Sequence, residues 1–227
     1  MSWFSQAISS TLGRKLLMAL TGLFLIIFLL VHLIGNFQLL ADDGGESFNI
    51  YAKFMTSNPI IKTTSYLLYS TFLVHIIWAI LLTIQNKKSR PVDYAEHAGS
   101  TNSAWSSRNM GILGTIIFIF LVIHLRGFWY EMHWGGIPTA NYDGVEVKDL
   151  YTVVQQAYSE WWYMAIYVVS MIFLMFHLIH GFQSAFQTLG LNHPKYNTVI
   201  KSIGIGYAIL IPGAFAAIPI IMFLQSL

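Results

Sequence analysis

Five long apolar stretches, separated by polar connections, dominate the pattern of this chain. They cover residues 14–40, 60–85, 109–133, 160–187 and 199–225. Each has at least the roughly 20 residues that a helix needs to cross about 30 Å of hydrocarbon at 1.5 Å per residue. The pattern therefore predicts an all-α membrane protein with five transmembrane helices and a single domain over residues 1–227.

Composition agrees with this prediction. Of the 227 residues, 56% are hydrophobic and only 10% are charged, whereas soluble domains carry about 25% charged residues. The chain has no cysteine, so its side chains offer no thiolate ligands for iron–sulfur clusters and no attachment point for a covalent c-type haem. The net charge of +2 is too small to indicate nucleic-acid binding.

Lysine and arginine are concentrated on one side of the predicted helices. The N-terminal segment and the second and fourth connections hold Arg14, Lys15, Lys87, Lys88, Arg90, Arg108, Lys195 and Lys201. The other side holds Lys53, Lys62, Arg126 and Lys148. Because basic residues are retained on the cytoplasmic side, we expect the N-terminus in the cytoplasm and the C-terminus outside.

Four histidines interrupt four different apolar stretches. They are His32, His75, His124 and His177. An ionisable side chain in hydrocarbon is costly and usually functional. Two pairs of imidazoles can ligate two haems from both sides, so the first four helices are expected to form a haem-binding bundle for two haems b.

Two of these histidines are predicted to lie far from the cytoplasmic face of the membrane. His32 is 17 residues beyond Lys15, and His124 is 16 beyond Arg108. At 1.5 Å per residue, both lie about 25 Å from the cytoplasmic face. The equal depth predicts that these two histidines form one pair, towards the outer surface.

The other two histidines are predicted to lie nearer the cytoplasm. His75 precedes Lys87 by 12 residues, which places it about 18 Å from that face. His177 lies shortly before the polar turns that begin at Gln183. These two are expected to form the inner pair.

Several neighbouring residues extend the predicted site. His180 follows His177 by three residues on nearly the same helix face, so it is either a rival ligand or a group that supports the ligand. Four basic residues are candidates to pair with haem propionates: Arg14, Lys15, Arg108 and Arg126. The fifth stretch has no histidine and contains two prolines, so we expect it to be peripheral to the bundle.

Three other roles for the four histidines fit the sequence less well. Structural histidines that bond to neighbouring polar groups would explain one such residue better than four at two matched depths. A shared zinc or di-metal site is disfavoured because the pairs differ in depth and no carboxylate lies between them. A proton relay would normally include intramembrane Asp or Glu, which these stretches lack.

Two motifs resemble those of a known family. One is R-K…H-L-x-x-N, and the other is H-x-x-x-G-x-x-S followed by T-x-G. Their residues are Arg14, Lys15, His32, Leu33 and Asn36, then His177, Gly181, Ser184, Thr188 and Gly190. With one histidine in each of the first four helices, the chain resembles the di-haem cytochrome b anchor of succinate:menaquinone oxidoreductases (succinate dehydrogenase or fumarate reductase), of the single-chain, five-helix type.

The resemblance implies a membrane anchor that does not itself oxidise succinate. In this family a flavoprotein subunit and an iron–sulfur subunit dock on the cytoplasmic face, and electrons pass through two haems to menaquinone. The family pattern places the fourth ligand at His177. It also implies the inner membrane of a bacterium and a contribution of this chain to the quinone site.

Quinone reduction consumes protons, so a site on the outer side needs polar groups. Glu46 and Glu131 are the candidates for proton transfer there. Two alternatives to this function remain open from the sequence. One is the cytochrome b subunit of a formate dehydrogenase or hydrogenase, and the other is a haem-free transporter or assembly protein.

Overall fold

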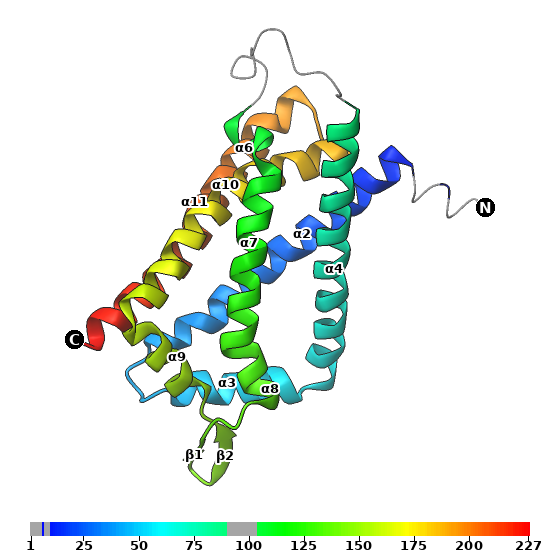
Figure 1. The fold of residues 1–227 in the computed structure, drawn as a ribbon. Helices are drawn as coiled ribbons and strands as arrows, with labels where there is room; N and C mark the ends of the chain where they lie inside the picture. The colour runs from blue at the N-terminus through cyan, green and yellow to red at the C-terminus, as the bar shows by residue number, and fades with distance from the viewer. Residues whose placement is uncertain (1–5, 7–9, 90–103) are drawn as a thin grey trace.

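The computed structural model describes residues 6, 10–89 and 104–227 and is almost entirely helical (Figure 1). In this part of the chain, five helical segments are long and apolar enough to cross a membrane: Thr11–Leu40, Pro59–Lys88, Met110–Trp134, Trp161–Thr188 and Pro194–Gln225. They coincide with the five predicted stretches. The chain is therefore an all-α, multi-pass membrane protein, as the sequence predicts.

The helical segments follow one another with short additional elements. The first consists of α2 (Thr11–Asn36) and a 3-10 turn, η1 (Phe37–Leu40). It is followed by α3 (Glu46–Ser57) and α4 (Pro59–Lys88). The third begins after α6 (Trp105–Arg108) and consists of α7 (Met110–His124), the π-helical turn η2 (Leu125–Trp129) and α8 (Tyr130–Trp134). The remaining elements are β1 (Thr139–Tyr142), β2 (Val145–Lys148), α9 (Leu150–Ser159), α10 (Trp161–Thr188) and α11 (Pro194–Gln225).

Local sequence determines where two of the long helices begin. The Asn58 side chain accepts hydrogen bonds from the N–H groups of Ile60 and Ile61, and Pro59 occupies the first turn of α4. His193 and Pro194 begin α11 in the same way. A polar cap followed by proline satisfies free N–H groups and presets the helical φ angle.

Four of the long helices form a closed ring. Going round it, α2 packs against α4, α4 against α7, α7 against α10, and α10 against α2 (Figure 1). In this order α2 lies diagonally opposite α7, and α4 lies diagonally opposite α10. Side chains at the centre of the ring therefore meet partners from the diagonal helix.

The fifth helix lies outside this ring of four, as predicted, but it is well buried against two of the ring helices. About a third (33%) of the apolar segment of α11 is buried, against 6% for α4. A β-carbon built at Gly204 would lie 2.6 Å from Phe182 Cδ1, so glycine allows α11 to approach α10 closely. The Tyr207 hydroxyl donates to the carbonyl of Ile26 on α2. Packing on two helices at once buries α11 although it holds none of the four paired histidines.

A cap of short elements covers one end of the bundle. It comprises α3, α8, the antiparallel hairpin β1–β2 and α9, which gather below the long helices in Figure 1. Asn49 on α3 is fully buried at its centre. Its amide donates to Tyr142 and Asp149 at 3.1 and 2.8 Å, and its oxygen accepts from the Tyr151 N–H at 2.9 Å. One satisfied amide thus joins α3, the hairpin and α9.

The burial of α11 predicts which of its residues matter for stability. Ala208 has no exposed surface, so Ala208→Leu should destabilise the protein by about 1–3 kcal/mol through overpacking. The neighbouring Ile209 is 51% exposed, so Ile209→Ala should change stability by less than about 0.5 kcal/mol. Thermal unfolding of both variants in detergent measures the difference, and equal effects would contradict the packing of α11.

Candidate functional site

Four histidine rings face one another in two pairs inside the ring of helices. We name the pairs after their expected positions in the membrane. The outer pair is His32 on α2 and His124 on α7, with 5.7 Å between ring centroids and 90° between ring planes. His75 on α4 and His177 on α10 form the inner pair, at 6.4 Å and 65°. Each pair joins diagonally opposite helices. The spatial pairing predicted from depth is therefore confirmed.

The two pairs lie at different levels along the bundle. On α2, Thr21 contacts the inner pair and His32 follows it by 11 residues. On α10, Tyr167 contacts the outer pair and His177 follows it by 10 residues. At 1.5 Å per residue, both helices place the levels about 15 Å apart.

The outer pair lies next to the cap. His32 is four residues from the end of α2, and His124 is the last residue of α7, directly before the π-helical turn. Such turns alter the direction of the following side chains and recur at functional sites. Phe128 within the turn packs edge-on against the His124 ring.

Two of the four rings have a hydroxyl partner at Nδ1. Thr21 Oγ1 lies 3.0 Å from His75 Nδ1 and donates its own hydrogen to the Leu17 carbonyl at 2.7 Å. The Tyr167 hydroxyl lies 3.4 Å from His124 Nδ1. Both hydroxyls come from a helix adjacent to that of the histidine. These contacts leave Nε2 as the nitrogen free to ligate a metal.

The other two rings are held differently. The Asn36 amide lies 3.4 Å from both ring nitrogens of His32 and donates to the His32 carbonyl at 2.7 Å. In the described part of the chain, two buried side-chain atoms lack a hydrogen-bond partner: Trp78 Nε1 and His177 Nδ1. Trp78 lies one turn after His75, so both unpartnered atoms belong to the surroundings of the inner pair.

The geometry fits two haem groups. A metal–imidazole bond of about 2 Å on each side, with the radius of each ring added, requires ring centroids roughly 6 Å apart. The observed separations are 5.7 and 6.4 Å. Among the described residues, no three His, Asp or Glu side chains form a group suited to a bare metal ion. Two imidazoles per centre suit an iron whose other ligands come from a macrocycle.

His180 does not share the position of His177. The His177 ring faces His75, whereas His180 lies one turn further along α10 and makes no ring contact with another described residue. This arrangement favours His177 as the inner ligand and leaves His180 as a neighbour of the ligand.

The four basic candidates for propionate pairing differ in their surroundings. Arg14 is half-buried and donates to Gln85 Oε1 at 2.9 Å, which joins α2 to α4. Arg126 forms an ion pair with Glu131 and lies over the Tyr130 ring, 4.5 Å from its centroid. The other two candidates are exposed: Lys15 and Arg108. Arg14 is thus the candidate best placed towards the bundle interior.

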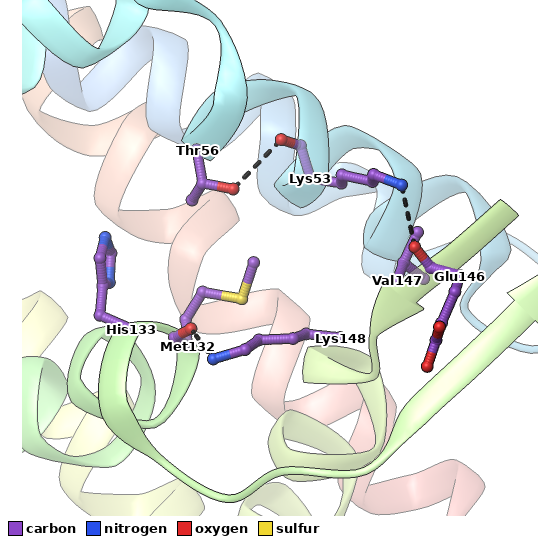
Figure 2. Close-up of a pocket in the computed structure, with 7 residues that line it drawn as sticks. All are labelled: Lys53, Thr56, Met132, His133, Glu146, Val147 and Lys148. Carbon is purple, nitrogen blue, oxygen red and sulfur yellow. Dashed lines mark hydrogen bonds between the residues drawn. The ribbon is translucent and has the colours of Figure 1, made fainter.

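Two clefts open at the cap end. The α3 cleft, of about 620 Å³, is lined by Gln38, Asp43, Glu46, Ser47, Ile50, Tyr51 and Phe54. The lysine cleft, of about 340 Å³, is lined by Lys53, Thr56, Met132, His133, Glu146, Val147 and Lys148 (Figure 2). Glu46 therefore lines a cleft, whereas Glu131 lines neither of these two and pairs with Arg126.

The α3 cleft adjoins the outer histidine pair. A β-carbon at Gly35, three residues after His32, would lie 2.5 Å from Tyr51 Cε1, so the tyrosine ring packs directly on α2. Burial raises the pKa of Tyr51, which keeps its phenol protonated. Hydrogen bonds from Ser47 and Gly45 hold the pKa of Asp43 below its usual range. The Asp43 carboxylate is thus engaged by backbone N–H groups at the start of α3. Glu46 is the other carboxyl group that lines the cleft.

The two lysines that line the lysine cleft connect elements of the cap. Lys53 Nζ donates to the Glu146 carbonyl at 2.9 Å, and Lys148 Nζ donates to the Met132 carbonyl at 2.7 Å (Figure 2). The two ammonium groups thereby tie the hairpin to α3 and α8.

Sequence reasoning missed the hydroxyl partners of the histidines and the tyrosine of the α3 cleft. Thr21, Tyr167 and Tyr51 carry no motif of their own. The available signal was spacing: Thr21 precedes His32 by 11 residues, and Tyr167 precedes His177 by 10. Each hydroxyl residue thus lies about three turns from a histidine on its own helix.

Comparison of the chain with protein-family models, curated proteins and solved structures found no match.

The inner pair predicts different outcomes for the two neighbouring histidines of α10. His177→Ala removes the ring that faces His75 and should abolish one of two haem components in the optical spectrum of the purified protein. His180→Ala should retain both components. Loss of a component only in the His180 variant would contradict the assignment.

Proposed function

We propose that this protein is a di-haem cytochrome b that carries electrons across a membrane as the anchor subunit of a succinate:quinone oxidoreductase. The observation that supports this most directly is the arrangement of the histidines. Two pairs lie on diagonally opposite helices of one ring, at two levels about 15 Å apart along the helices.

The residues of the chain would do three things for such a function. His32 with His124, and His75 with His177, would each hold one haem iron between two imidazoles. The apolar surroundings of the rings would exclude water and help set the potentials. Two haems b, when bound, would supply one-electron carriers at two depths.

The two ends of the bundle would serve different partners. The basic end carries Arg14, Lys15 and Arg108 and would face the cytoplasm, where an iron–sulfur subunit with its flavoprotein could dock. The cap end would face outward from the inner membrane of a bacterium. The α3 cleft there is our proposed menaquinone site, because it combines Glu46 with the aromatic rings of Tyr51 and Phe54 beside the outer pair.

Haem content and partner identity test the proposed function. The protein purified from its native membrane should contain two low-spin haems b per chain and copurify with a flavoprotein and an iron–sulfur subunit. A protein without b-type absorption would point to the haem-free transporter or assembly protein instead. Copurification with formate dehydrogenase or hydrogenase subunits would indicate that the protein is the cytochrome b subunit of one of those enzymes.

The proposed quinone site predicts a selective effect of one carboxylate. Glu46→Gln should slow quinone turnover on the order of 100-fold, the usual scale for losing a proton donor, while succinate still reduces both haems. Asp42→Asn is the matched control, since Asp42 is exposed four residues away and does not line the cleft. Glu131→Gln should have a smaller effect because Glu131 is engaged with Arg126. Equal rates for the Glu46 and Asp42 variants would exclude this placement.

A further inference from the structure

Helices α2 and α10 each contribute to both histidine pairs. α2 carries His32 of the outer pair, and its Thr21 contacts His75 of the inner pair. α10 carries His177 of the inner pair, and its Tyr167 contacts a ring of the outer pair. Each of the two helices therefore supplies a histidine ring at one level of the bundle and a hydroxyl group at the other level.

The hydrogen bonds of Thr21 favour the form of His75 that carries its proton on Nδ1. A hydroxyl has one hydrogen, and that of Thr21 is donated to the Leu17 carbonyl. With that hydrogen on the carbonyl, the Thr21 oxygen is left to accept from Nδ1–H of His75, 3.0 Å away. The adjacent Cε1 of the same ring lies 3.6 Å from a β-carbon built at Gly22, so this edge of the ring rests on α2. His75 is thus held with Nδ1 towards α2, which leaves Nε2 as its basic nitrogen.

Tyr167 stands in the equivalent position at the other level. Its hydroxyl lies 3.4 Å from His124 Nδ1 and 3.4 Å from the Tyr163 hydroxyl. In an arrangement equivalent to that of Thr21, it would accept from the ring N–H and donate its own hydrogen to Tyr163. Because this contact is longer than that of Thr21, it is the weaker of the two.

We propose that Thr21 and Tyr167 are positioning residues that separately set the reduction potentials of the two haems; this rests on the proposed di-haem function. A hydrogen bond accepted from Nδ1–H makes the opposite nitrogen more basic. A more basic ligand stabilises ferric over ferrous iron and lowers the potential. Because each pair has one such hydroxyl, the reduction potential of each haem would be set separately.

Redox titration of haem absorbance in the purified protein tests the role of Thr21. Thr21→Val keeps the shape but removes the hydroxyl. It should raise the reduction potential of one haem component only, the one that His177→Ala abolishes. The expected rise is about 59 mV for one electron, which corresponds to a tenfold change in the ratio of reduced to oxidised haem. Thr21→Ser should restore the potential of the native protein. Thr83→Val is the matched control, because the Thr83 hydroxyl also donates within its helix, to the Ala79 carbonyl.

Tyr167→Phe should raise the potential of the other component only, and by less. Tyr207→Phe, which removes a part-buried hydroxyl that donates to the Ile26 carbonyl, is its control. Loss of the inner haem in Thr21→Val but not in Thr83→Val would also support an orienting role. Unchanged potentials in both test variants, or a shift of the same component by both, would overturn the inference. Absence of haem from the unmutated protein would instead overturn the proposed function.

Discussion

Placing imidazole rings inside an apolar helix bundle is the constraint on which the rest of this structure depends. A buried polar group without a partner costs free energy. Three of the four rings have a polar neighbour, whereas Nδ1 of His177 has none among the described residues. The rings of His32 and His124 meet across one diagonal of the bundle, and those of His75 and His177 meet across the other. These contacts require each of the four helices to be rotated with its histidine towards the centre.

Helices α2 and α10 each contribute a histidine ring to one pair and a hydroxyl to the other, so both pairs depend on these two helices. α11 packs on both, through Tyr207 to the carbonyl of Ile26 and through the close approach of Gly204 to Phe182. A helix without a paired histidine thus stabilises the two helices that serve both levels. α4 lies on the other side of the ring and is the most exposed of the five.

The cap gives the two ends of the bundle different chemistry. The buried Asn49 joins α3 to the hairpin and to α9, and the two lysines of the lysine cleft bond to backbone carbonyls. These contacts hold α3 across the end of the outer pair. The α3 cleft, with Glu46 and Tyr51, is therefore attached to a rigid element rather than to a loose loop.

The sequence alone determined the five spans, the four helices that carry histidine, and the pairing of the rings. It could do so because helix length and rise per residue are local properties, so depth follows from counting residues. Tertiary structure decided what lies around each helix. The apolar pattern of α11 did not reveal its burial against two neighbours. The polar segment 41–58 became α3 only through contacts such as those of Asn49. The spacing of Thr21 from His32 was visible in the sequence, but its contact with His75 was not, nor was the separation of Glu46 from Glu131. A side chain's partner depends on helix rotation and on packing between distant segments.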